Sequence, residues 1–210
     1  MKKLKNKMTK VIGITGGIGS GKSTFVKYLK EQAFNIHDSD YEVQKIYKEP
    51  TNKFLQHLKK IGLQESIKKN NKIDKKIIAK IIFTNNNTKK ELENFIFKIV
   101  RDKRKLFIKK FKNKKNKFIF IDVPLLFEND LDNIFYKIIS IVANKSIRYQ
   151  RLKKNKKMSK EMFENIIKSQ TSDMVRKQRS DIVIYNNLTL EKFRYKAIKT
   201  IKDNFIWEKL

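Results

Sequence analysis

The sequence predicts an α/β protein built on a five-stranded parallel sheet. Short apolar segments typical of buried strands alternate along the 210 residues with segments of helical periodicity. A glycine-rich segment, residues 16–24, directly follows the first apolar segment. The apolar fraction of 40% is sufficient for a hydrophobic core in a chain of this length. Because strands joined through helices form right-handed crossovers, we expect the strands to be parallel.

The glycine-rich segment matches the pattern Gly, four residues, Gly-Lys-Ser without a mismatch. Residues 11–15 before it predict a buried strand, and residues 24–31 after it place Phe25, Tyr28 and Leu29 on one helical face. Strand, loop and helix in this order form the context in which such a loop binds phosphate. The residues predicted to bind a nucleotide are Gly17, Ile18, Gly19, Ser20, Gly21, Lys22, Ser23 and Thr24.

The residue types of this segment suit ATP and Mg²⁺. Glycines let the backbone adopt positive φ and bring several N–H donors close to one triphosphate. The helix that follows directs its unpaired N–H groups and the positive end of its dipole toward the same anion. Lys22 adds a charge for the β- and γ-phosphates, and the Ser23 hydroxyl is a ligand for Mg²⁺. The alternative, an incidental glycine-rich turn, leaves the lysine, the serine and the flanking elements unexplained.

The net charge of +30 is compatible with nucleic-acid binding. The lysines, however, are scattered through every segment among asparagines and isoleucines. The sequence has no compact basic arm, zinc-finger spacing or RNA-binding aromatic motif. We therefore interpret the charge as a compositional bias and expect no specific nucleic-acid partner.

The absence of cysteine excludes disulfides and cysteine-based zinc sites, and it fits a reducing cytoplasm. No apolar run approaches the roughly 20 residues that span a bilayer, so we expect no membrane partner. Residues 1–10 are basic but lead into the glycine-rich segment rather than into the apolar part of a signal peptide. Met8 is an alternative to Met1 as the first residue. We expect a cytoplasmic protein that is a monomer or a weak oligomer.

Two carboxylates follow the second predicted strand, residues 34–37. Asp38 and Asp40 come at the carboxyl end of this strand, which is where parallel sheets bind ligands. Either one is also able to cap the helix that follows, although capping explains one aspartate more easily than two. His37 is predicted to be structural, and His57 is predicted to lie on an exposed helical surface.

Residues 41–115 lack strand patterning and predict a helical insertion on the sheet, a suitable place for a second substrate. The predicted helices are residues 41–48, 52–61, 74–83 with Asp74 as the cap, and 88 to about 112.

The remaining strands are predicted at residues 117–124, 137–143 and 182–185, and the remaining helices at 161–177 and 190–205. The strand 117–124 is apolar on both faces and therefore central. Near its end, Asp122 is either a Walker-B-like carboxylate that helps to hold a metal or a buried, hydrogen-bonded strand end. The basic residues 148–160 are either a solvated helix face or a mobile flap that closes an arginine over the triphosphate.

Taken together, these segments resemble the dephospho-coenzyme A kinase family over nearly the whole chain. The residues that carry the resemblance are 13–24, 38–40, 124–128 (Pro-Leu-Leu-Phe-Glu), Arg151, Leu152, Gln170, Arg176, 180–184 and Asn186. The resemblance implies a three-layer P-loop kinase fold with a helical insertion and a small lid. One domain, 1–210, would then comprise a core of residues 8–40, 116–145 and 178–210, an insertion of residues 41–115 and a lid of residues 146–177.

The resemblance also implies the reaction, which moves the γ-phosphoryl group of ATP to the ribose 3′-hydroxyl of dephospho-coenzyme A. By analogy, Asp40 takes the hydroxyl proton late in the transfer, since an ordinary aspartate is a weak base for an alcohol. Arg151 matches a lid arginine that grips the phosphates beside Lys22, and Arg176 matches a basic position near the nucleotide. The acceptor contacts that the resemblance assigns are Asp38, Asp40, Leu125 and Glu128.

The chain departs from the family pattern at several positions on the acceptor and lid sides. Phe97 and Lys98 replace a His-Pro pair, Asn155 replaces a second lid arginine, and Arg148 replaces a glutamine. An Asp-Gly-x-Leu segment is reduced to residues 72–74. The ATP side is intact. The alternatives are a P-loop kinase of another nucleotide or small alcohol and a nucleic-acid-binding ATPase.

Overall fold

The computed structural model describes residues 9–112, 118–156 and 158–206. The predictions made at Met8, Lys117 and Lys157 lie outside these residues. The chain divides into two compact units. The sheet unit comprises the described residues up to His37 and from Ile108 onward, and the helical unit is Asp38–Phe107.

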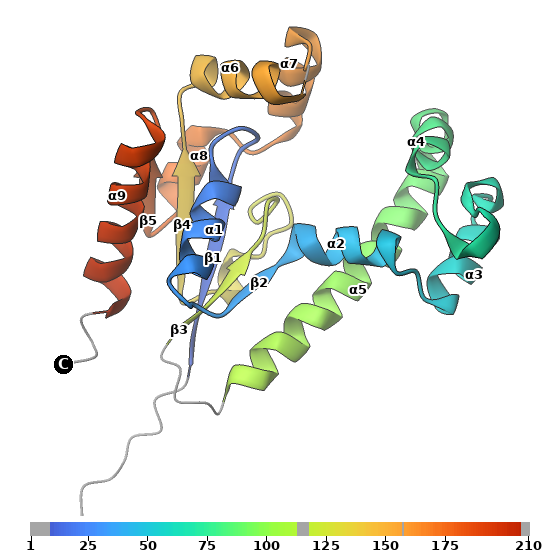
Figure 1. Ribbon diagram of the computed structural model, residues 1–210, viewed down its shortest axis with the longest axis horizontal. Helices are drawn as coiled ribbons and strands as arrows, with labels where there is room; N and C mark the ends of the chain where they lie inside the picture. The colour runs from blue at the N-terminus through green and yellow to red at the C-terminus, as the bar shows by residue number, and fades with distance from the viewer. Residues whose placement is uncertain (1–8, 113–117, 157, 207–210) are drawn as a thin grey trace, which may run out of the picture. The chain divides into compact units, whose positions relative to one another are not determined.

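The sheet unit contains the predicted five-stranded parallel sheet, with the strand order β2-β3-β1-β4-β5 (Figure 1). The strands are β1 Lys10–Gly16, β2 Ile36–Asp38, β3 Phe118–Asp122, β4 Lys137–Val142 and β5 Ile182–Tyr185. The central strand β1 pairs with β3 and β4, so that Ile14 lies between Asp122 and Ile139. All five residues of β3 are buried, as expected for a strand that is apolar on both faces, but the central position predicted for it belongs to its neighbour β1.

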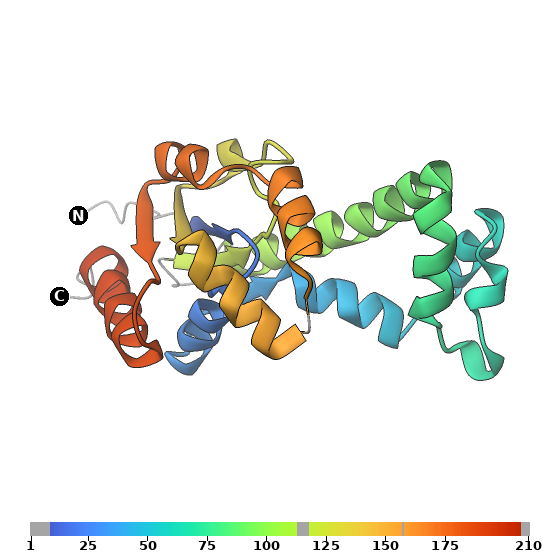
Figure 2. The same ribbon diagram turned by 90° about the horizontal axis from the view of Figure 1, so that it is seen from above.

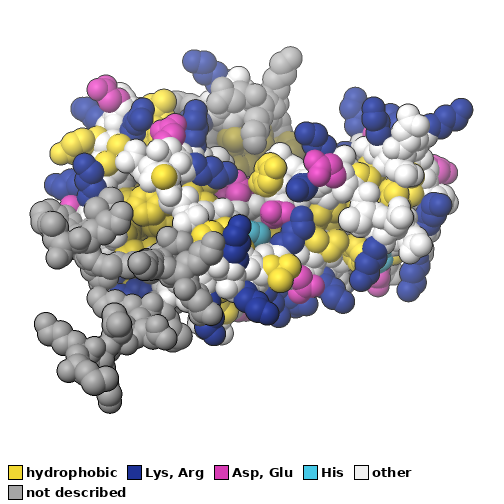
Figure 3. Space-filling view, turned by 60° about the horizontal axis from the view of Figure 1, so that its bottom comes forward, with side chains coloured by type: hydrophobic (Ala, Val, Ile, Leu, Met, Phe, Trp, Pro, Cys, Tyr) yellow, Lys and Arg dark blue, Asp and Glu magenta, His cyan; other side chains and the backbone are white. Residues whose placement is uncertain are grey.

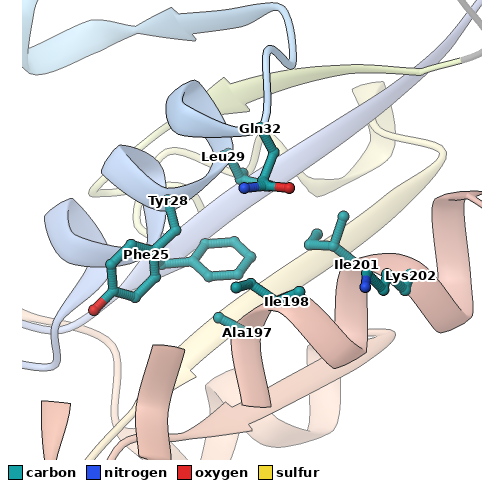
Figure 4. A pocket seen from close by; sticks show the side chains of 8 residues that line it. All are labelled: Phe25, Tyr28, Leu29, Gln32, Ala197, Ile198, Ile201 and Lys202. Atoms are coloured by element: carbon teal, nitrogen blue, oxygen red, sulfur yellow. The ribbon is translucent and has the colours of Figure 1, made fainter. Parts of the chain in front are cut away.

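One face of the sheet is covered by α1 (Lys22–Glu31) and α9 (Leu190–Ile201), the latter continued by a π-helical turn, Lys202–Ile206. Apolar side chains of both helices form one cluster with the strands. Figure 4 shows the seam between the helices, where Phe25 and Leu29 face Ala197 and Ile201. The space that remains there is about 10 Å³, no more than the minimum that holds one water molecule, so the seam is packing rather than a ligand site. Packing along this seam fixes α1, which carries Lys22 in its first turn.

The opposite face packs against the segment after β3 and against the end of α5 (Asn86–Lys112). Leu126, Phe127 and Ile108 bury apolar surface there against Ile121 and Ile138. Figures 1 and 2 show α8 (Asp173–Arg179) on this side and α1 with α9 on the other. The arrangement is the three-layer α/β architecture that the sequence predicts.

The helix predicted over residues 161–177 is interrupted in the structure. α6 (Lys145–Lys156) is followed by α7 (Lys160–Ser169) and by the separate helix α8. Gln170 has extended backbone angles, φ −102° and ψ 151°, and Ser172 caps α8 by accepting a hydrogen bond from the N–H of Val175. The prediction of one continuous helix was therefore wrong at residues 170–172, which separate α7 from α8.

The helical unit contains helices in the places where the sequence predicts them, and it also has an isolated antiparallel bridge between Ile67 and Ile73. Its helices are α2 Ser39–Lys48, α3 Asn52–Lys60, α4 Lys75–Thr84 and most of α5, with 3-10 turns at Gln64–Ser66 and Lys69–Asn71. Asp74 accepts a hydrogen bond from the N–H of Lys76 and caps α4, as predicted. Phe54, Leu58 and Leu63 are fully buried at the centre of this unit.

The two histidines differ in how well the sequence predicted them. His37 is 4% exposed, as expected for a structural residue. His57 is partly buried rather than exposed, because its ring stacks on Phe95 with 3.9 Å between the centroids.

Lysine and arginine side chains are spread over the face drawn in Figure 3, with acidic and apolar side chains between them. This face therefore carries mixed charge rather than a single basic groove. No helix in the described part of the chain is long and apolar enough to cross a membrane.

Candidate nucleotide-binding site

The glycine-rich loop connects the end of β1 at Gly16 to the start of α1 at Lys22. Gly19 has a φ of 73° and Gly21 a φ of 100°, values that side-chain-bearing residues rarely adopt. A Cβ atom on Gly21 would also lie 2.1 Å from the side-chain nitrogen of Asn186. These two positions therefore require glycine for the loop to keep its shape.

The loop presents backbone donors at the positive end of α1. Ile18 and Ser20 donate their N–H groups within the protein, to Gln170 and to the Gly17 carbonyl. Among the described residues, the N–H groups of Gly19, Gly21, Ser23 and Thr24 have no protein acceptor. Unpaired N–H groups that meet at a helix N-terminus form an anion site, so this geometry suits phosphate.

Lys22 lies in the first turn of α1 and is buried with Asp122, the last residue of β3. The Lys22 Nζ atom lies 2.7 Å from each carboxylate oxygen of Asp122. The sequence left two readings for Asp122, and the structure gives this carboxylate a hydrogen-bonded partner at the strand end. The carboxylate thus holds the ammonium in place at the start of the helix that follows the loop.

The helix α6 contacts the glycine-rich loop through two of its side chains. Arg148 donates from Nε to the Ile18 carbonyl at 2.7 Å, and the side chain of Leu152 approaches Gly19. Both side chains are buried, so the first turns of α6 belong to the packed sheet unit. The spacing of 148 and 152 places them on one face of the helix.

Arg151 reaches the loop through Asn186, the residue after β5. Its Nη2 donates to the backbone and side-chain oxygens of Asn186 at 3.0 and 3.2 Å. Asn186 in turn donates to the Ser20 carbonyl at 2.8 Å. Burial lowers the pKa of the Arg151 guanidinium from its ordinary value. The arginine that was predicted to grip phosphates is thus connected to the loop through a single residue, Asn186.

Arg176 and Glu128 are brought together in a buried ion pair of 3.0 Å. Arg176 is 1% exposed and also donates to Asp173 at 3.0 Å, while Glu128 accepts the N–H of Thr171 at 2.7 Å. Leu125, assigned to the acceptor with Glu128, is partly buried in the turn that precedes it. The sequence assigned Arg176 and Glu128 to different substrates, whereas the structure pairs them.

Asp38 and Asp40 belong to the helical unit, at the start of α2. The Asp38 carboxylate accepts the N–H of Tyr41 at 2.9 Å and so caps the helix. Asp40 is exposed in the first turn. The capping alternative therefore holds for Asp38 and does not account for Asp40.

Sequence reasoning missed the contacts of Arg148, Asp173 and Asn186. Asn186 entered only as part of a resemblance, and Arg148 only as a departure from it. The helical spacing of Arg148, Arg151 and Leu152 is a signal that could have placed all three on one face.

Backbone donors at a helix start, together with one buried ammonium at the carboxyl end of a parallel sheet, serve to hold the terminal phosphates of a nucleotide. With this loop in a three-layer α/β fold, the molecule is a P-loop kinase. The chain belongs to the dephospho-CoA kinase family, whose model matches residues 10–192. It is accordingly a phosphotransferase of coenzyme A biosynthesis. The enzymes of this family use ATP as a substrate.

Individual relatives agree with this assignment. A dephospho-CoA kinase of Fusobacterium nucleatum is 37% identical over 182 residues, 86% of this chain and 91% of that protein. The solved dephospho-CoA kinase from Campylobacter jejuni has a TM-score of 0.72 and 27% identity, with 96% of this chain and all of that one covered. TT1252 from Thermus thermophilus, at 23% identity, shares the fold with a TM-score of 0.77 over 95% of this chain and 99% of its own. The resemblance inferred from sequence motifs is confirmed.

Proposed function

We propose that this chain transfers the γ-phosphoryl group of ATP to the ribose 3′-hydroxyl of dephospho-coenzyme A and releases coenzyme A and ADP. The observation that carries the proposal is the loop itself, with unpaired N–H groups around Lys22 at the start of α1. In phosphoryl transfer the protein mainly positions the substrates and stabilises charge, and these donors are suited to both tasks.

On the nucleotide side, the loop N–H groups and Lys22 hold the β- and γ-phosphates. Lys22 exchanges part of its contact with Asp122 for the phosphate oxygens, while Asp122 keeps the lysine close to the loop. The Ser23 hydroxyl, exposed in the first turn of α1, would hold Mg²⁺ together with the phosphates. The described residues contain no group of three or more histidine, aspartate or glutamate side chains that could bind a metal. This donor set fits Mg²⁺, which is usually bound through substrate phosphates and one or two protein oxygens.

On the acceptor side, we assign the role of proton acceptor to Asp40 and helix capping to Asp38. Asp40 orients the 3′-hydroxyl and accepts its proton as the bond to phosphorus forms. Arg151 stabilises the charge of the transferring group, and Leu125 and Glu128 remain proposed acceptor contacts. We further propose that the partners are these small molecules alone, in the cytoplasm, and that the chain is a monomer or a weak oligomer.

The test is coupled detection of ADP with dephospho-coenzyme A as the acceptor. We expect ADP and coenzyme A in equal amounts. Turnover with another nucleotide or small alcohol, but not with dephospho-coenzyme A, would support the broader kinase alternative. ATP hydrolysis stimulated by DNA or RNA at physiological salt would support a nucleic-acid-dependent ATPase.

Arg151→Ala should lower kcat about 10- to 100-fold and leave the Kd for ADP nearly unchanged, since ADP lacks the transferring group. Steady-state kinetics and ADP titration would measure the two quantities. The matched variant is Asn186→Ala, which removes the contact between Arg151 and the loop. If the function of Arg151 is only to hold Asn186 in place, both variants should weaken ADP binding equally. That result would contradict the catalytic role of Arg151.

Glu128→Gln should lower the free energy of unfolding by about 1 to 3 kcal/mol, because it removes one of the two carboxylates that the fully buried Arg176 contacts, Asp173 being the other. Denaturant unfolding would measure this loss. Asp132→Asn, which alters the exposed pair with Arg179, should leave stability close to native. A higher KM for dephospho-coenzyme A without loss of stability would instead identify Glu128 chiefly as an acceptor contact.

A further inference from the structure

A buried arginine lies against the phosphate-binding loop and takes no part in the roles assigned above. Arg148 is 3% exposed, and its Nε donates to the Ile18 carbonyl at 2.7 Å. A Cβ atom on Gly17 would lie 2.5 Å from one of its terminal nitrogens. Gly17 is not among the glycines with positive φ, so its lack of a side chain serves the approach of this guanidinium.

The N–H group of Ile18 is held as well. It donates to Oε1 of Gln170 at 3.0 Å, and Gln170 lies in the break between α7 and α8. Both polar backbone groups of Ile18 are therefore bound by side chains that come from residues 146–177. Two opposed hydrogen bonds on one residue restrict rotation of its peptide groups and fix the first half of the loop.

Arg148 belongs to a charge-balanced network rather than to a set of unneutralised cations. Asp173 accepts from Arg148 at 2.9 Å and from Arg176 at 3.0 Å, and Glu128 accepts from Arg176 at 3.0 Å. Burial lowers the pKa of the Arg148 guanidinium, and the Asp173 carboxylate opposes that shift. Because its charge is neutralised by Asp173 and its Nε binds a carbonyl, Arg148 is arranged to hold protein rather than phosphate.

We propose that Arg148 is a positioning residue that, with Gln170, fixes the turn at residues 17–19 so that the loop N–H groups converge before the nucleotide binds. The loop is rich in glycine and would otherwise lose much backbone entropy on binding. A loop that is already ordered avoids this loss and binds more tightly. The inference rests on the proposed function, since it requires the loop to bind a nucleotide.

Arg148→Gln removes the charge and the bond to Ile18 but keeps a polar side chain. We expect the Kd values for ADP and ATP, measured by titration calorimetry, to rise about 10- to 100-fold, as for the loss of one charge-assisted hydrogen bond. The kcat at saturating substrate should fall by less than about fivefold, because the lost interaction acts in the ground state and the transition state alike. Arg194→Gln removes the same charge from an exposed pair between Arg194 on α9 and Glu31 on α1, and it should change neither quantity.

Gly17→Ala tests the same contact from the loop side. Its Cβ would displace the guanidinium, so we expect a similar rise in the Kd for ADP. In an Arg148→Ala background the methyl group has room, and the same substitution should have little further effect. A double-mutant cycle would thus show coupling between the two positions, which a general loss of stability would not produce.

Two results would overturn the proposal. One is strictly additive effects in the cycle. The other is an unchanged Kd for ADP in Arg148→Gln; if kcat falls while ADP binding is unchanged, Arg148 is a group that contacts only the transition state. If the native chain fails to bind ADP and ATP, the proposed function itself fails. If thermal unfolding shows that Arg148→Gln is not folded, a cycle of Arg148→Lys with Gly17→Ala decides in its place.

Discussion

Lys22→Met should reduce phosphoryl transfer by about 10³-fold or more. The variant keeps an unbranched side chain of similar length but loses the ammonium that we propose contacts the β- and γ-phosphates. Loss of a charge aimed at the transferring group typically costs about 3 to 4 kcal/mol of transition-state stabilisation. Measurement of kcat by ADP release would show the effect, and near-native turnover would contradict the assignment of the nucleotide site.

This substitution has a second effect that needs its own control. Asp122 is 2% exposed, and Lys22→Met removes the ammonium 2.7 Å from its carboxylate oxygens. Breaking a buried pair in this way costs about 3 to 5 kcal/mol of stability. Lys22→Met combined with Asp122→Asn should recover most of that stability in denaturant unfolding without recovering turnover. Recovery of both would mean that the lysine serves the fold rather than the chemistry.

Asp40→Asn should lower kcat about 10²- to 10⁴-fold and leave the Kd for ATP unchanged. The amide has the shape of the carboxylate but accepts no proton, and the side chain is exposed, so folding should be little affected. Single-turnover kinetics with saturating ATP would isolate the chemical step.

Asp38 supplies the matched control for this experiment. Asp38→Asn keeps a good helix cap and should leave kcat much closer to native, whereas Asp38→Ala should cost about 1 kcal/mol of stability. Weaker ATP binding in Asp40→Asn, with an unchanged chemical step, would show that Asp40 acts through the metal or the fold.

The sequence predicted those parts of the molecule that local patterns determine. Strand β1, the loop and α1 are contiguous, so their periodicity and glycine spacing were enough to define them. The Asp74 cap was likewise readable, because a cap and its helix are neighbours in sequence. The helix break at residues 170–172 was missed, although Ser172 followed by an acidic residue is an ordinary helix start.

The contacts that shape the site were beyond local patterns. Lys22 and Asp122 are 100 positions apart, and Ile18 is 130 positions from Arg148 and 152 from Gln170. No periodicity relates such residues, because only the packing of α6 and of the break before α8 onto the loop brings them together. For the same reason, the ion pair between Arg176 and Glu128 was not predicted, although both residues were singled out in the sequence.

The hydrogen bond from the Asn186 side chain to the Ser20 carbonyl has a consequence for the synthesis of the protein. Ser20 leaves the ribosome 166 positions before Asn186, whose side-chain amide holds its carbonyl. A nascent chain that already contains the whole glycine loop therefore still lacks one of its anchors. Affinity for ATP should be acquired late, and bound nucleotide should stabilise mainly chains whose translation has passed the last strand.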